Sequence, residues 1–330
     1  MTHAPGALPP ARSRNLPAHP TAHRSARPRR GRGALHGLVQ RPPLGIRLAL
    51  AVVATATISA VLVFAQTPPN VFAIDVFGQL RAPGDPALIV GHRGDRSVAP
   101  ENTIPALEVA MDTLEYVETD VQLTRDGVPV LFHDVTLERV AGDPRRIGDL
   151  DLAKVRGFDV GAGYDASFRG TRIPTLEEFL ASLGERPEAR ALVELKASWT
   201  PDEVRIVLGL IERAGVRDRV VLESFSIESL ASIAAVSPST PRIMLIRELP
   251  ADPRAIAAQF GLIGFGTTAK SVTAAPNAVA LAHEAGLAVL CYTLNSEESW
   301  SEVSALGVDG IITDQPSSLD AWLAATSPGT

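Results

Sequence analysis

Short apolar runs alternate with amphipathic stretches from residue 87 to residue 325, and this alternation limits the possible folds more than any other feature. The runs have the length and composition of strands, and the stretches between them repeat apolar residues at helical spacing. Eight strand–helix units over this length favour a TIM (β/α)8 barrel rather than a doubly wound sheet. Asp126-Gly127 separates two strand-like runs and predicts a hairpin with one additional short strand. The predicted strands are 87–91, 116–123, 128–132, 191–195, 220–225, 243–246, 262–265, 287–292 and 310–312, and the predicted helices include 175–183, 201–214, 227–235 and 277–285.

The first 86 residues lack this alternation. Residues 1–47 are rich in Pro, Arg, Ala and His, and we expect them to be disordered because they bury too little apolar surface. Residues 48–65 are uncharged and largely apolar, and they are just long enough to cross a bilayer as one helix. Residues 66–86 contain four prolines and are expected to form a linker. The sequence therefore predicts a single folded domain over residues 87–325.

Charge is distributed unevenly between the two ends of the chain. Nine arginines and no acidic residue precede Asp75, which leaves 22 basic residues against all 37 acidic ones in the remainder. The positive-inside rule then predicts a single-pass membrane protein, with residues 1–47 in the cytoplasm near anionic lipid and the domain outside the cell. Secretion after cleavage near residue 65 is the alternative, although the apolar segment is long for a signal peptide. The acidic domain also argues against nucleic acid as a partner.

Two of the three histidines beyond residue 74 follow predicted strands directly. His92 and Arg93 come after the run 87–91, and His133 comes after the run 128–132. In a TIM barrel, the carboxyl ends of the strands surround the active site. Histidines placed there can transfer protons near neutral pH, and an arginine can bind a phosphate group. The third, His283, lies in an amphipathic stretch and is expected on the surface of a helix.

Charged residues occur two positions apart in or directly after two of the predicted strands. Glu118 and Asp120 are two residues apart, as are Glu194 and Lys196, so each pair projects from one face of its strand. Like charges that converge inside a barrel repel one another unless a cation lies between them. Oxygen ligands favour Ca²⁺ or Mg²⁺. Cys291 is the only cysteine, which excludes a cysteine-based zinc site and a disulfide within the chain.

The ordered set of these motifs closely resembles the glycerophosphodiester phosphodiesterase family, and the likeness covers roughly residues 87–325. The matching motifs, in chain order, are His92-Arg93-Gly94, Pro100-Glu101-Asn102-Thr103, Glu118-x-Asp120, His133-Asp134, Leu137-x-Arg139, Ile173-Pro174-Thr175-Leu176-Glu177, Glu194-Leu195-Lys196, Ser224-Phe225, Thr293-Leu294-Asn295 and Gly310–Pro316.

The resemblance implies a TIM barrel that hydrolyses glycerophosphodiesters to glycerol 3-phosphate and an alcohol, with Ca²⁺ or Mg²⁺ as cofactor. By position, His92 and His133 would be the acid and base. Glu118, Asp120 and Glu194 would bind the metal. A substrate hydroxyl next to the ester would attack phosphorus, and water would open the resulting cyclic phosphate.

The same resemblance assigns supporting roles to five further residues. Arg93 and Lys196 would contact the phosphate group, and Glu101 and Asn102 would support the site from a loop. Tyr292 stands where the family often has Trp, and it would still offer an aromatic wall to the substrate.

Two other functions stay open at this point. The substrate could be a lysophospholipid or a wall polymer with a glycerol phosphate backbone, because the predicted anchor places the domain near lipid and wall. The chain could instead be a membrane-tethered binding protein that has the fold without turnover, although no position of the inferred site is lost.

Overall fold

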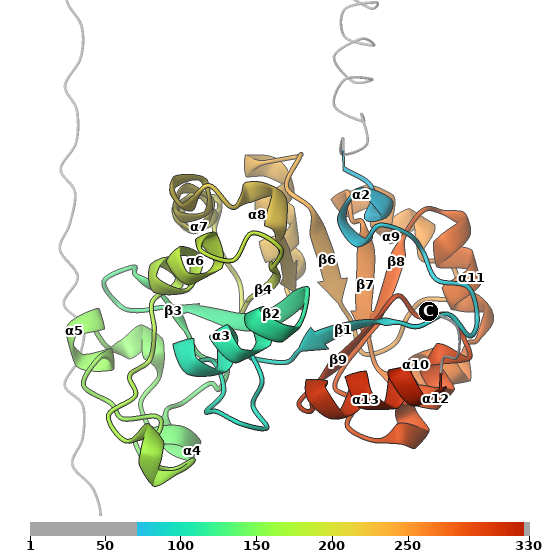
Figure 1. Ribbon diagram of the computed structural model, residues 1–330. Coiled ribbons are helices and arrows are strands. Elements are labelled where there is room, and N and C mark those ends of the chain that lie inside the picture. The colour runs from blue at the N-terminus through green and yellow to red at the C-terminus, as the bar shows by residue number, and fades with distance from the viewer. Residues whose placement is uncertain (1–70, 327–330) are drawn as a thin grey trace, which may run out of the picture. The chain divides into compact units, whose positions relative to one another are not determined.

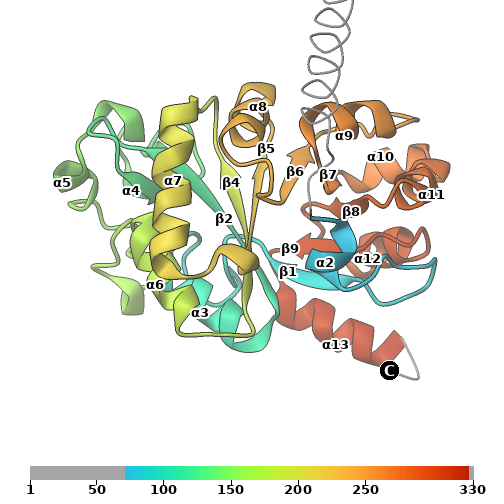
Figure 2. The same ribbon diagram turned by 90° about the horizontal axis from the view of Figure 1, so that it is seen from above.

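The computed structural model describes residues 71–326, and in it eight parallel strands form a closed barrel. Pairing between β1 and β2 closes the ring, and Figure 2 shows the helices around the outside of the strands. The predicted TIM barrel is therefore confirmed. The barrel strands are β1 (Leu88–Gly91), β2 (Tyr116–Leu123), β4 (Arg190–Leu195), β5 (Val220–Ser224), β6 (Arg242–Leu245), β7 (Gly264–Thr267), β8 (Ala288–Cys291) and β9 (Gly310–Thr313).

The predicted hairpin is also present. β3 (Pro129–Leu131) pairs antiparallel with the second half of β2, where Val121 lies opposite Leu131. Gly127 in the connecting turn has a φ of 78°, a conformation that glycine adopts without steric cost. β3 thus pairs with β2 alone and is not one of the eight strands that form the ring.

Helices follow most of the barrel strands, and α7 (Pro201–Ala214) shows why they form where they do. Thr200 and Glu203 form a capping box at its first turn, and Gly215 ends the helix in the left-handed conformation. The other helices of eight residues or more are α3 (Ile104–Thr113), α6 (Leu176–Gly184), α8 (Ile227–Val236), α11 (Asn277–Glu284), α12 (Glu297–Ser304) and α13 (Pro316–Thr326). The shorter helices are α2 (Ala73–Phe77), α4 (Glu138–Ala141), α5 (Leu152–Val155), α9 (Arg254–Phe260), α10 (Ala269–Ala274) and three 3-10 turns at Ile147–Asp149, Ala166–Phe168 and Arg217–Arg219.

Helix α2 lies against the amino-terminal end of the barrel. Ala73, Val76 and Phe77 are buried among apolar side chains that point into the ring, and the hydroxyl group of Tyr116, the first residue of β2, donates a hydrogen bond to the carbonyl oxygen of Val76. The interval 66–86, expected to be a linker, therefore contains a helix that packs into the fold. This apolar layer leaves the carboxyl end of the barrel as the place for polar side chains.

Within residues 71–326, no helix combines the length and the apolar character that crossing a membrane requires. The predicted transmembrane segment 48–65 and the predicted disordered segment 1–47 lie outside the described residues.

Candidate active site

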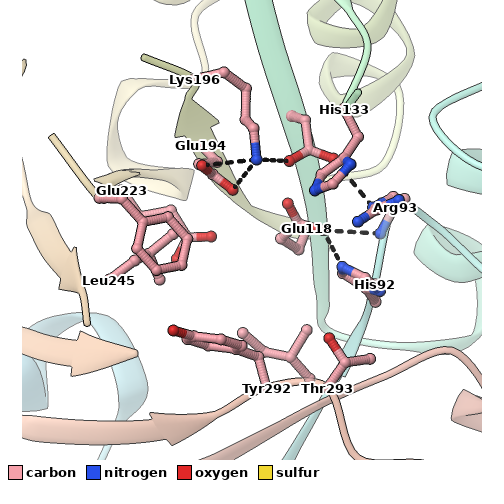
Figure 3. Close-up of a pocket in the computed structure, with 13 residues that line it drawn as sticks. His92, Arg93, Glu118, His133, Glu194, Lys196, Glu223, Leu245, Tyr292 and Thr293 are labelled. Atoms are coloured by element: carbon pink, nitrogen blue, oxygen red, sulfur yellow. Dashed lines mark hydrogen bonds and ion pairs between the residues drawn. The ribbon is translucent and has the colours of Figure 1, made fainter. Parts of the chain in front are cut away.

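A pocket opens at the carboxyl end of the barrel, and all the predicted charged residues except Glu101 line it (Figure 3). β1, β2, β4, β5, β6, β8 and β9, or the residues directly after them, supply most of its lining. The pocket is lined by His92, Arg93, Glu118, Asp120, His133, Glu194, Lys196, Glu223, Phe225, Leu245, Tyr292, Thr293 and Ile312.

Three carboxylates, called the carboxylate triad below, converge in this pocket: those of Glu118, Asp120 and Glu194. Asp120 on β2 lies directly opposite Glu194 on β4, and Glu118 projects from the same face of β2 as Asp120. One oxygen atom from each of the three lies within 4.8 Å of the others, and all three side chains are buried. The strand alternation that predicted this grouping is therefore reproduced in three dimensions.

Burial and mutual repulsion shift the pKa values of these groups. Burial and, next in size, repulsion by the charge of Asp120 raise the pKa of Glu118 well above its ordinary value. The same two causes raise the pKa of Glu194 to about 7. Burial would also raise the pKa of Asp120, but the neighbouring Lys196 and Arg93 outweigh it and lower that pKa. Burying three carboxylates close together costs free energy, because the charges lose water and repel one another. A bound cation would offset this cost.

Two basic side chains contact the carboxylates. Lys196 Nζ lies 3.3 Å from Asp120 Oδ1 and 3.0 Å from Glu194 Oε1. Arg93 Nε lies 3.2 Å from Asp120 Oδ2, and the backbone N–H of Arg93 donates to Glu118 Oε2 at 2.9 Å. Both cations therefore lie beside the carboxylates and line the pocket, where they could also meet an anionic ligand.

The loop after β1 is held in an unusual conformation. Arg93 and Asn102 have φ angles of 57° and 53°, a region that non-glycine residues seldom occupy. A Cβ on Gly94 would lie 2.5 Å from the backbone of Ala106 in α3, so only glycine lets the loop pack this closely. The tight packing fixes the backbone that presents His92 and Arg93 to the pocket.

Asn102 links this loop to the carboxylates. Its side-chain amide donates to Asp120 Oδ2 at 2.9 Å, and its carbonyl oxygen accepts from the hydroxyl group of Thr119 at 2.7 Å. Its backbone N–H donates to the carbonyl oxygen of Arg93 at 3.0 Å. Asn102 thus restrains the orientation of the Asp120 carboxylate.

Each pocket histidine is held by an aspartate. Nδ1 of His92 lies 2.6 Å from Oδ1 of Asp314, and Nδ1 of His133 lies 2.8 Å from Oδ1 of Asp134. A hydrogen bond from Nδ1 to a carboxylate leaves Nε2 as the nitrogen available to a ligand. Nε2 of His92 lies 4.0 Å from Glu118 Oε2, which places it beside the carboxylate triad.

Glu101, which is not part of the carboxylate triad, forms ion pairs with three arginines. Its oxygen atoms pair with Arg93 at 2.8 Å, Arg96 at 2.8 Å and Arg139 at 2.6 Å. Burial would raise the pKa of Glu101, but the arginines, with the Arg139 hydrogen bond first among them, lower it. These ion pairs restrain Arg93, and Arg139 also pairs with Asp134 at 2.6 Å.

Sequence reasoning missed three residues of this site. Asp314 and Asp134 occur in motifs that the sequence contains, GIITDQP and His133-Asp134, but only the structure pairs them with the histidines. Glu223 on β5 is a fourth buried carboxylate in the pocket, and its pKa is raised by burial and by Glu194. Its signal was an acidic residue in an otherwise apolar strand.

His283 lies on a helix as expected, but it is less exposed than a surface residue. It lies on α11 and is partly buried, because its Nε2 pairs with the fully buried Asp309 at 2.9 Å. Asp309 also accepts hydrogen bonds from the backbone N–H groups of Arg81 and Val289. His283 thus has a structural role and does not line the pocket.

The donor set of the triad suits a divalent cation. All three groups are carboxylates, which are the ligands that hard cations such as Ca²⁺ and Mg²⁺ prefer. Among the described residues, no other group of three or more His, Cys, Asp or Glu side chains is placed to hold a metal ion.

The sequence is similar to one family of known proteins. The sequence model of the glycerophosphoryl diester phosphodiesterase family matches residues 92–318. The chain is 29% identical over 235 residues to a glycerophosphodiester phosphodiesterase of Caldanaerobacter subterraneus, a match that covers 70% of this chain and 96% of the relative. It is also 29% identical over 259 residues to a glycerophosphodiester phosphodiesterase of Bacillus subtilis, covering 72% and 87% of the two chains.

The fold is similar to the solved structures of phosphodiesterases. An Oleispira antarctica phosphodiesterase, solved in complex with the product sn-glycerol-3-phosphate, matches with a TM-score of 0.68 and 25% identity over 72% of this chain and 96% of that one. A glycerophosphodiester phosphodiesterase of Agrobacterium tumefaciens matches with a TM-score of 0.63 and 26% identity over 71% and 99%.

Proposed function

This chain belongs to the glycerophosphoryl diester phosphodiesterase family, a family of enzymes, and we propose that its pocket hydrolyses glycerophosphodiesters to glycerol 3-phosphate and an alcohol with a divalent metal ion as cofactor. The observation that carries the proposal is the convergence of Glu118, Asp120 and Glu194 within 4.8 Å, beside two histidines that are each held by an aspartate.

The cofactor we propose is Ca²⁺ or Mg²⁺, held by Glu118, Asp120 and Glu194. When bound, such an ion supplies positive charge that polarises phosphoryl oxygens and favours ionisation of a bound hydroxyl group. Its charge would also offset the repulsion that raises the pKa values of Glu118 and Glu194.

The protein's own residues position the diester and move its protons. Arg93 and Lys196 bind the phosphate oxygens and neutralise charge that builds up on them. One pocket histidine takes the proton from the attacking hydroxyl group of the glycerol moiety, and the other gives a proton to the leaving alcohol. Asp314 and Asp134 keep Nε2 of each histidine directed at the substrate. The hydroxyl oxygen bonds to phosphorus while the bond from phosphorus to the alcohol oxygen breaks, which leaves a cyclic phosphate. Water then opens the cyclic phosphate to glycerol 3-phosphate, with the roles of the two histidines reversed.

The proposal is tested with the full chain and glycerophosphocholine. We expect release of glycerol 3-phosphate in the presence of Ca²⁺ or Mg²⁺, loss of release with EDTA, and recovery when the metal is restored. His133→Gln should lower the rate by a factor on the order of 10³ while the circular dichroism spectrum stays the same. Absence of turnover with every metal and several diesters would leave the non-catalytic binding protein as the better account.

A substrate panel separates the alternatives within the same chemistry. The rival substrates are lysophospholipids and wall polymers with a glycerol phosphate backbone. Comparing kcat/KM for a soluble glycerophosphodiester, a lysophospholipid and a teichoic-acid-like polymer identifies the class that the pocket prefers. A polymer or lysolipid rate above that of the soluble diester would replace the substrate proposed above.

We further propose that residues 48–65 anchor the protein in the cell membrane with the barrel outside. The support is the apolar segment, the nine arginines before it and the acidic domain after it. Protease added to intact cells should digest the barrel. Protection of the barrel would reverse the proposed orientation, and a free protein that starts after residue 65 in the medium would favour secretion instead.

A further inference from the structure

The pocket has two chemically different sides (Figure 3). β1, β2 and β4 contribute the triad, the two basic residues and His92. β5, β6 and β8 contribute Glu223, Phe225, Leu245 and Tyr292, three of which are apolar or aromatic. In Figure 3, Glu223 and Leu245 lie across the pocket from His92 and Arg93. If the charged side binds the phosphate group, this second side faces the alcohol that leaves.

Among the described residues, Glu223 is the only acidic one that lines the second side of the pocket. The side chain is 2% exposed, and its Oε2 is buried without a hydrogen bond. The other pocket carboxylates each have a basic or backbone partner, as Asp120 has Lys196. Within residues 71–326, no donor pairs with this buried oxygen of Glu223. An unpaired buried carboxylate costs free energy unless a ligand supplies the missing partner.

Two aromatic rings line the same side of the pocket as Glu223. Phe225 and Tyr292 meet edge to face, with ring centroids 5.8 Å apart and an interplanar angle of 79°. The hydroxyl group of Tyr292 donates to the carbonyl oxygen of Ile246 at 3.1 Å, which fixes the ring. Phe225 is 47% exposed and leaves part of its ring free at the pocket. Aromatic faces attract organic cations, and quaternary ammonium groups most characteristically.

We propose that Glu223, Phe225 and Tyr292 form an alcohol subsite that binds the ammonium group of an amino-alcohol ester, of the choline or ethanolamine type. The inference rests on the proposed function, because it assigns the leaving alcohol of that same reaction. The ammonium group supplies the positive charge that Glu223 lacks, and the rings surround its alkyl groups. A hydroxyl group of a neutral polyol could donate a hydrogen bond to Glu223, but the polyol carries no positive charge for the aromatic faces to attract.

The test compares two diesters of the same shape. One is glycerophosphocholine, and the other carries a 3,3-dimethylbutyl group, in which carbon replaces the quaternary nitrogen. We expect the wild-type protein to favour the cationic diester by about tenfold in kcat/KM. Glu223→Gln should reduce this ratio at least about fivefold, and Phe225→Leu should reduce it about threefold. A choline lysophospholipid and its neutral analogue, measured in the same way, show whether the head group comes from a soluble diester or a lipid.

The matched control is Glu228→Gln. Glu228 is exposed at the start of α8, five residues from Glu223, and does not line the pocket. The substitution Glu228→Gln removes the same formal charge as Glu223→Gln, so the ratio of kcat/KM for the two diesters should stay at the wild-type value. A change in the ratio equal to that of Glu223→Gln would mean that the long-range field, and not the subsite, selects the cation.

The proposed function and the subsite fail in different ways. Turnover of both diesters with a ratio near one, or a ratio unchanged in Glu223→Gln and Phe225→Leu, overturns the subsite and leaves the phosphodiesterase intact. No turnover of either diester overturns the proposed function. The subsite is then decided by calorimetric binding of the two diesters to the full chain, where equal affinity overturns it. If Glu223→Gln does not fold, Phe225→Leu at the exposed rim carries the comparison.

Discussion

Nδ1 of His92 lies 2.6 Å from Oδ1 of Asp314, although 222 residues separate them in the chain. β1 and β9 are neighbours in the barrel, with Gly91 opposite Thr313, so the residues that follow the two strands meet. Burial would raise the pKa of Asp314, but the His92 hydrogen bond and nearby positive charge lower it to about 2, so the aspartate is ionised when it accepts the histidine N–H.

Replacing Asp314 should therefore impair catalysis without unfolding the protein. In Asp314→Asn, the neutral amide no longer fixes the Nδ1–H form of His92, and we expect kcat to fall on the order of 10²–10⁴-fold. Steady-state kinetics and a thermal melt measure the two effects. Asp320→Asn, on the exposed face of α13, is the control and should behave like the wild type. A kcat within about threefold of wild type in Asp314→Asn would remove the orienting role.

Metal binding should stabilise the fold through the triad. At a metal concentration about 100 times Kd, binding contributes about 2.7 kcal/mol, which corresponds to a rise in Tm of roughly 5–10 °C for a domain of this size. Glu118→Gln should abolish this rise and increase Tm in EDTA, because it relieves the repulsion among buried carboxylates.

Differential scanning calorimetry with Ca²⁺, Mg²⁺ or EDTA makes this measurement. Glu177→Gln, at an exposed position in the first turn of α6, controls for the loss of one negative charge. A wild-type Tm that no divalent ion raises would contradict the assignment of the triad.

Helix α2 should contribute to stability but not to catalysis. Phe77 is 4% exposed and packs against the ring of Tyr116, with centroids 5.6 Å apart, at the end of the barrel opposite the pocket. Phe77→Ala should lower the free energy of unfolding by about 3–5 kcal/mol through loss of buried area and the cavity that remains, while kcat stays unchanged. Urea denaturation measures the loss. Phe72→Ala, at an exposed neighbour, should cost less than about 1 kcal/mol, and equal losses in both variants would argue against the packed position of α2.

Cys291 should be chemically silent in the native protein. Burial, with a smaller effect of Asp309, raises the pKa of its thiol to about 12. Because the pKa is raised, the thiol stays protonated as pH increases, and at pH 9 only about one thiol in a thousand is ionised. A colorimetric thiol reagent should therefore react slowly at pH 7–9 and rapidly in concentrated urea. Fast reaction of the native protein would show that β8 opens to solvent.

The sequence predicts the strands well, and the largest error, in the position of β7, has a clear physical cause. All nine predicted strands are present, and their ends differ from the structure by at most two residues. The largest shift is at β7, predicted at 262–265 and observed at Gly264–Thr267. A Cβ on Gly264 would lie 2.5 Å from the carbonyl oxygen of Ala288, and one on Gly266 would meet Leu245 at the same distance. The strand needs glycines for close packing, whereas propensity favours the apolar residues before them.

The sequence by itself determined which residues share a face, because side-chain alternation along a strand is a local property of the backbone. It therefore grouped Glu118 with Asp120 and Glu194 with Lys196, and with the family resemblance it named the ten residues expected at the site. The tertiary structure decided which partners those residues have. Closure of the barrel brought Asp314 to His92, the loop after β1 placed Arg93 between Glu101 and Asp120, and the neighbours of β5 left Glu223 unpaired. Such contacts join residues far apart in the chain, so no local pattern encodes them, and they exist only once the strands have closed into a ring.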